Sequence, residues 1–95
     1  MYFVYIIETE DGTYYTGQTN DLYRRFTEHL SNSSRSAAYL RMHRPEYLVY
    51  LEECSTRVEA MKRERQIQRN RQLKMRLVGP RRHLLEVIES EASYR

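Results

Sequence analysis

The first twenty residues place apolar side chains in two short runs separated by a turn signal. Residues 2–8 are apolar at almost every position, which predicts a strand. Its two faces carry Phe3, Tyr5 and Ile7, and Tyr2, Val4 and Ile6. A strand that is apolar on both faces is typical of the covered centre of a sheet. Asp11-Gly12 predicts a hairpin turn, and residues 13–16 predict the antiparallel partner strand. Gly17 would then allow a sharp bend and a close approach of the backbone to a ligand.

Helical spacing replaces this pattern after residue 20. Asn20 is the expected N-cap of a helix over about 21–31. Its apolar stripe consists of Leu22, Phe26 and Leu30. A polar loop over 31–36 and a short helix over 37–42 follow, and Pro45 separates them from the next element.

The second half predicts one more strand and a series of helices. Residues 46–53 contain a continuous apolar run that indicates a third strand. Thr56-x-x-Glu59 is a capping box that opens a basic helix to about residue 70. A further helical stretch over 71–78 stops at Gly79-Pro80. The last predicted helix, over 81–91, can dock through Leu84, Leu85, Val87 and Ile88.

The predicted order of elements is β-β-α-α-β-α-α-α, an α+β fold with a small three-stranded antiparallel sheet flanked by helices. A chain of 95 residues makes one domain, 1–95, and we assign 80–91 to a C-terminal helical extension. Its one cysteine, Cys54, cannot form an internal disulfide and is expected to be a small buried hydrophobe. No signal peptide or membrane span is evident in the sequence, so we expect a cytoplasmic location.

The charge of the chain is unevenly distributed. The formal net charge is +3, but residues 57–82 hold ten Lys or Arg against Glu59 and Glu64 alone. A run so rich in arginine favours a polyanion such as nucleic acid, through phosphate contacts and counterion release. The alternative is a solvated helix face. The arginines that we expect to bind nucleic acid are Arg65, Arg69 and Arg76.

Two tyrosines, an arginine and a histidine are placed to share one surface. Tyr5 and Tyr15 lie on the two predicted strands, and Arg25 and His29 lie one turn apart on one face of the following helix. Two phenols, a guanidinium and an imidazole around one surface are suited to binding a phosphate. Tyrosines can also be packing residues with a polar tip, and Arg25 could simply pair with Asp21.

This ordered set resembles the GIY-YIG nuclease superfamily, and within it the small stand-alone YhbQ-like branch. Phe3-Val4-Tyr5 stands at the GIY element, and Tyr15-Thr16-Gly17 stands at the YIG element. Arg25 and the segment 59–64 match the arginine and glutamate helices, and the resemblance spans about residues 2–78. Phe3 replaces the first glycine of the family pattern and Thr16 its isoleucine, while Gln18 stands where some relatives carry lysine.

The resemblance implies a role for each site residue. Glu64 would bind Mg²⁺ or Mn²⁺, which tolerates a single protein carboxylate because it keeps waters and takes phosphate oxygens as ligands. Tyr15 would deprotonate the attacking water, and Tyr5 would position that water. Arg25 would hold the scissile phosphate. His29 would assist the base or contact phosphate, or else be a satisfied structural histidine.

These implications lead to a divalent-metal-dependent endonuclease that hydrolyses phosphodiester bonds in nucleic acid, with DNA preferred to RNA. Gly17 and Gln18 would contact the nucleic acid together with the arginines named above. Two alternatives are a non-catalytic nucleic-acid-binding module on the same fold and a protein-interaction adaptor that uses the C-terminal helix. The residues Tyr5, Arg25 and Glu64 favour the enzyme because catalysis needs them together with the second tyrosine.

Overall fold

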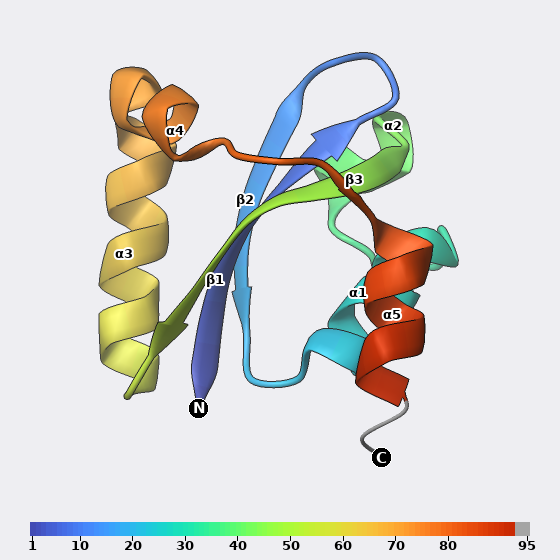
Figure 1. Cartoon of the computed structure of the whole chain (residues 1–95), viewed down its shortest axis with the longest axis horizontal. Coiled ribbons are helices and arrows are strands. Elements are labelled where there is room, and N and C mark those ends of the chain that lie inside the picture. Colours follow the sequence, from blue (N-terminus) through green and yellow to red (C-terminus); the bar gives the residue numbers. More distant parts are fainter. Residues whose placement is uncertain (93–95) are drawn as a thin grey trace.

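A computed structural model of the chain, describing residues 1–92, has one antiparallel sheet of four strands in the order β2-β1-β3-β4 (Figure 1). The strands are β1 (Tyr2–Thr9), β2 (Tyr14–Thr19), β3 (Pro45–Cys54) and β4 (Arg82–His83). The prediction of three strands is therefore wrong. Strand β4 has only two residues and pairs with Tyr47 and Leu48 of β3. So short a strand has no apolar alternation of its own and forms only because β3 offers it an edge.

Helices cover both faces of the sheet (Figure 1). On one face lie α1 (Leu22–Leu30), α2 (Ala38–Met42) and α5 (Leu84–Ala92). On the other face lie α3 (Arg57–Arg69) and α4 (Arg71–Leu77). The side chains of β1 enter the two cores alternately: Tyr5 and Ile7 belong to the first cluster, and Val4 and Ile6 belong to the second. The prediction of a central strand covered on both sides is confirmed.

The ends of the helices follow local capping chemistry. Helix α1 is capped by Asp21, whose carboxylate accepts a hydrogen bond from the Arg24 amide at 3.1 Å, and not by Asn20 as expected. Both residue types cap well, so sequence alone does not separate neighbouring candidates. At α3 the predicted capping box is present, with Thr56 Oγ1 accepting from the Glu59 amide at 3.2 Å.

The C-terminal helix begins at Leu84, later than expected, because residues 82–83 are in β4. Leu84 and Val87 are buried in the same cluster as Tyr5, so α5 helps to close the core beneath the tyrosines. Leu85, which we expected to dock, is 66% exposed. Cys54 is buried, as predicted. None of the helices in residues 1–92 is both long enough and apolar enough to span a bilayer.

Candidate active site

The phenol ring of Tyr5, a residue of β1, lies against Gly17 of the neighbouring strand β2. The two residues are partners in the β1–β2 ladder. A Cβ at position 17 would lie 2.5 Å from Tyr5 Oη and 2.9 Å from Tyr15 Cε2, closer than real Cβ atoms approach other heavy atoms. The predicted bend at Gly17 is wrong, because β2 continues through it to Thr19. The glycine is needed for the space that it leaves to both rings.

Tyr5 is held by a buried hydrogen bond to His29. The Tyr5 side chain is 0% exposed, and its Oη lies 2.9 Å from Nε2 of His29, which is 1% exposed. His29 Nδ1 lies 3.5 Å from Ser36 Oγ, and that hydroxyl donates to the carbonyl of Ala37. Since the serine proton is used there, Nδ1 is the protonated nitrogen and Nε2 accepts from the tyrosine hydroxyl. Burial, followed by the charge of Arg25, lowers the pKa of His29 to about 3, so the ring is neutral at neutral pH.

Tyr15 is the more accessible of the two phenols. It is half-buried, and its ring centroid lies 6.4 Å from that of Tyr5 and 5.7 Å from that of His29. Burial raises the pKa of both phenols, most strongly for Tyr5. Both phenols are therefore neutral at rest, and a further cation next to them is needed to favour the phenolate.

Arg25 brings a fixed cation to the phenols. Its Nη1 donates to Glu28 Oε1 at 3.1 Å and to the carbonyl oxygen of Arg35 at 2.7 Å. The ion pair considered from the sequence, with Asp21, is replaced by the one with Glu28. The guanidinium lies close enough to Tyr5 and Tyr15 to lower the pKa of each, against the larger effect of burial. A cation held by a carboxylate and a carbonyl is pre-oriented for a phosphate.

Glu64 approaches the same phenols from the opposite face of the sheet. Gln68, one turn further along α3, donates from Nε2 to the carbonyl oxygen of Thr16 at 3.2 Å and ties the helix to the edge strand β2. The Glu64 carboxylate raises the pKa of both tyrosines, which places it near their rings. Burial raises its own pKa, opposed by Arg65. Within residues 1–92 it forms neither an ion pair nor a side-chain hydrogen bond, so no arginine of the described chain neutralises its carboxylate by direct pairing.

The donor set fits a hard divalent cation that keeps most of its own waters. The described part of the chain has no group of three or more His, Cys, Asp or Glu side chains able to hold a metal. A single unpaired carboxylate near an arginine and two phenols is compatible with Mg²⁺, which can take its other ligands from water and substrate. Glu64 would be its protein ligand.

The structure thus brings together the predicted residues Tyr5, Tyr15, Gly17, Arg25, His29 and Glu64. Arg65, Arg69 and Arg76 are exposed and line neither of the two concavities that adjoin these residues. Their contribution to nucleic-acid binding stays a prediction.

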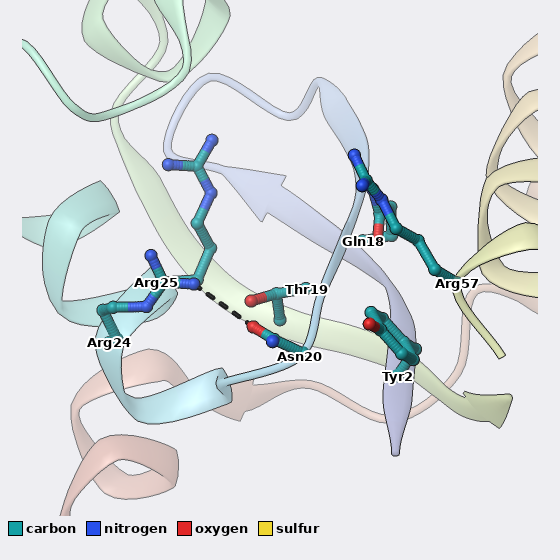
Figure 2. A pocket seen from close by; sticks show the side chains of 7 residues that line it. All are labelled: Tyr2, Gln18, Thr19, Asn20, Arg24, Arg25 and Arg57. Atoms are coloured by element: carbon teal, nitrogen blue, oxygen red, sulfur yellow. Dashed lines mark hydrogen bonds between the residues drawn. The ribbon is translucent and has the colours of Figure 1, made fainter. Parts of the chain in front are cut away.

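One of these concavities, the arginine pocket, has a volume of about 400 Å³ and contains residues that the sequence analysis did not select. Figure 2 shows Arg24 and Arg25 from α1 on one side and Arg57 from α3 on the other. The remaining lining residues are Tyr2, Gln18, Thr19 and Asn20. Arg57 precedes Glu64 by seven residues, two helical turns, so both lie on one face of α3. A helical projection centred on Glu64 would have found it.

The two departures from the family pattern have different surroundings. Phe3, at the first glycine of GIY, packs against the core beneath α1 and α5. Thr16, at the isoleucine of YIG, pairs with Ile6 and is buried, and its Oγ1 has no hydrogen-bond partner within residues 1–92. Neither substitution displaces Tyr5 from its bond to His29.

Comparisons with known proteins show which family this chain resembles. A sequence model of the GIY-YIG catalytic domain matches residues 1–76. The UPF0213 protein DP2720 of Desulfotalea psychrophila is 52% identical over 63 residues, which cover 66% of this chain but only 56% of that relative's length. A UPF0213 protein of Staphylococcus aureus strain Mu3 is 42% identical over 81 residues, covering 84% of this chain and 96% of that protein. The solution NMR structure of UPF0213 protein BH0048 from Bacillus halodurans has a TM-score of 0.51 and 37% identity, covering 81% of this chain and 82% of that one.

Tyr5, Tyr15, Arg25 and Glu64 all lie within the matched residues. The nucleases of this family generally use a divalent metal, and nucleic acid is their substrate. The resemblance seen in the sequence is confirmed. The chain belongs to the GIY-YIG family of nucleases, and its relatives place it in the UPF0213 branch.

Proposed function

We propose that this protein is a divalent-metal-dependent endonuclease that hydrolyses phosphodiester bonds in nucleic acid, with DNA preferred to RNA. The observation that carries the proposal is that a cationic and an anionic side chain lie near the same two phenols. Arg25 from α1 and Glu64 from α3 approach Tyr5 and Tyr15 from opposite faces of the sheet, with Arg25 held by Glu28 and Glu64 in no ion pair within residues 1–92. A structural tyrosine pair does not require a cation and an unpaired carboxylate on either side of it.

In this proposal Arg25 holds the scissile phosphate and offsets the charge that develops on its oxygens. Glu64 would hold Mg²⁺ or Mn²⁺, which would stabilise the negative charge on the leaving oxygen. Tyr15 takes the proton of the attacking water, because its phenol is the one that solvent reaches. Arg25, together with a divalent cation if one is held at Glu64, would favour the phenolate that this step requires.

Tyr5 and His29 support Tyr15 from the core. The Tyr5 hydroxyl donates to neutral His29, so its ring is fixed at 6.4 Å from that of Tyr15. The role that the resemblance gives to Tyr5, positioning the attacking water, stays a prediction. The cytoplasmic location also stays a prediction.

The proposal is tested by incubating the protein with end-labelled single- and double-stranded DNA and RNA. Each substrate is offered with Mg²⁺, with Mn²⁺ and with a chelator. We expect cleavage that requires the metal, and its loss in Glu64→Ala and Glu64→Gln while nucleic acid is still bound. Glu89→Gln, an exposed glutamate on α5, is the matched control and should cleave like the wild type.

Two results would contradict this assignment. Undiminished metal-dependent turnover in Glu64→Ala would remove Glu64 from the site. Binding of nucleic acid without cleavage under any of these conditions would favour the non-catalytic binding module instead.

A further inference from the structure

The second concavity that adjoins the catalytic residues, the Tyr39 pocket, lies at the other end of β2 from the arginine pocket. Its volume is about 380 Å³, which is within the range of pockets that bind small molecules. Its walls include Tyr39 of α2, Gln68 of α3, and Arg71 and Lys74 of α4.

The ring of Tyr39 is exposed but held in place. It is 37% exposed and stacks on the His43 imidazole, with ring centroids 4.4 Å apart and planes inclined by 27°. His43 is itself fixed, because its Nδ1 lies 2.6 Å from Asp11 Oδ2. A surface tyrosine without such support would lose rotamer freedom on binding, whereas this ring is already ordered.

Two cations stand in the same pocket without a compensating acid. Among the described residues neither Arg71 nor Lys74 forms an ion pair within 4.0 Å. Burial, together with the charge of Arg71, lowers the pKa of Lys74. An anion placed between the two side chains would relieve their repulsion and gain from both charges.

The pocket lies next to the catalytic residues, because its Tyr39 neighbours Tyr15 and its Gln68 lies on the same helix as Glu64. Tyr39 is nearly parallel to Tyr15, with ring centroids 6.2 Å apart and an interplanar angle of 24°. Gln68 follows Glu64 by one turn of α3 and is bonded to Thr16 on β2. A strand with a phosphate at Arg25 and Glu64 would therefore run next into this pocket.

We propose that the Tyr39 pocket binds an unpaired nucleotide next to the scissile phosphate, with its base stacked against Tyr39 and its phosphate held by Arg71 and Lys74. A base inside a duplex has both faces covered by its neighbours, so only an unpaired or extruded base can stack on a side chain. The inference rests on the proposed function and narrows its substrate to nucleic acid with a single-stranded or unpaired segment at the cleavage site.

The test measures equilibrium binding with a chelator present, so that cleavage does not enter the result. The probes are a fluorescent single-stranded DNA of about 12 nucleotides and the same sequence as a blunt duplex. Tyr39→Ala should weaken single-strand binding about 5- to 140-fold, the range expected for one lost base stack, and leave duplex binding within about 2-fold. Tyr39→Phe keeps the ring and should bind both probes like the wild type.

A second pair of variants, which have the same net charge as each other, tests the phosphate contact. Lys74→Gln should weaken single-strand binding more than Lys62→Gln, which removes the same charge from an exposed position outside the pocket. Circular dichroism of each variant confirms that it is folded.

The outcomes separate this inference from the proposed function. An unchanged single-strand affinity in Tyr39→Ala, or an equal loss for strand and duplex, would overturn the subsite while metal-dependent cleavage by the wild type still stood. Failure of the wild type to bind the single strand would also overturn the subsite, whereas the proposed function is decided separately by the cleavage assay.

Discussion

Replacing Gly17 by alanine tests whether this glycine is required for space. The added Cβ would lie 2.5 Å from Oη and 2.7 Å from Cζ of Tyr5, and 2.9 Å from Cε2 of Tyr15. Tyr5 cannot swing aside easily, because it is fully buried, bonded to His29 at 2.9 Å and packed edge-on against Phe26 at 5.1 Å between centroids. The substitution must therefore move β2 away from β1 or displace both phenols.

The expected loss of stability follows from these contacts. Overpacking of a core costs about 1–3 kcal/mol. Disturbing the buried bond between Tyr5 and His29 adds about 0.5–1.5 kcal/mol. The free energy of unfolding of Gly17→Ala should thus fall by roughly 2–4 kcal/mol, which for a domain of this size lowers the midpoint of thermal unfolding by roughly 10–30 °C.

The assay is thermal and urea unfolding followed by circular dichroism. Gly79→Ala is the matched control, because a Cβ there would lie 3.5 Å from its nearest heavy atom, the carbonyl oxygen of Val49, an ordinary contact. In a double-mutant cycle the loss should be smaller in a Tyr5→Phe background, where the closest atom is absent. A midpoint for Gly17→Ala within about 2 °C of the wild type would refute the steric role, since it would correspond to less than about 0.5 kcal/mol.

Four further predictions follow from single contacts. His29 has a pKa of about 3 in the folded state, against 6.5 for an ordinary histidine, so below about pH 6.5 the unfolded chain binds a proton that the folded protein does not. The free energy of unfolding should therefore fall as the pH drops from about 6.5 toward 3. His29→Gln should flatten this decline in urea titrations. Arg25→Lys should recover only part of the cleavage rate lost in Arg25→Ala, because lysine keeps the charge but not the planar fork; equal rates in both variants and the wild type would exclude a phosphate contact. Thr16→Val removes a buried hydroxyl without a partner in the described structure and should raise the free energy of unfolding by about 1 kcal/mol; a loss of stability would show that the hydroxyl is satisfied. Arg57→Gln should flatten the plot of log affinity against log salt by up to about 0.7–0.9, more than Lys62→Gln does at an exposed position outside the pocket; equal slopes would mean that the arginine pocket does not hold a phosphate.

Local features of this protein could be predicted because each depends on residues close together in the chain. The two-sided apolar pattern of residues 2–8 indicated the central strand, since the face of each side chain follows from strand geometry alone. Thr56 and Glu59 indicated the start of α3 through hydrogen bonds that span three residues. The order of Tyr5, Tyr15, Arg25 and Glu64 indicated the family, which the comparisons confirm.

Only the tertiary structure decided features that depend on residues far apart in the chain. Strand β4 exists because β3 offers it an edge, and Gly17 is required because Tyr5 lies across it. Arg57 joins Arg25 only when α3 packs beside β2, and Tyr39 joins Tyr15 only when α2 folds over the same strand. Sequence periodicity specifies which face of an element is buried, but not which neighbour covers it. Which elements become neighbours depends on how the apolar faces of all of them are buried together. This packing brings the site residues together around β2.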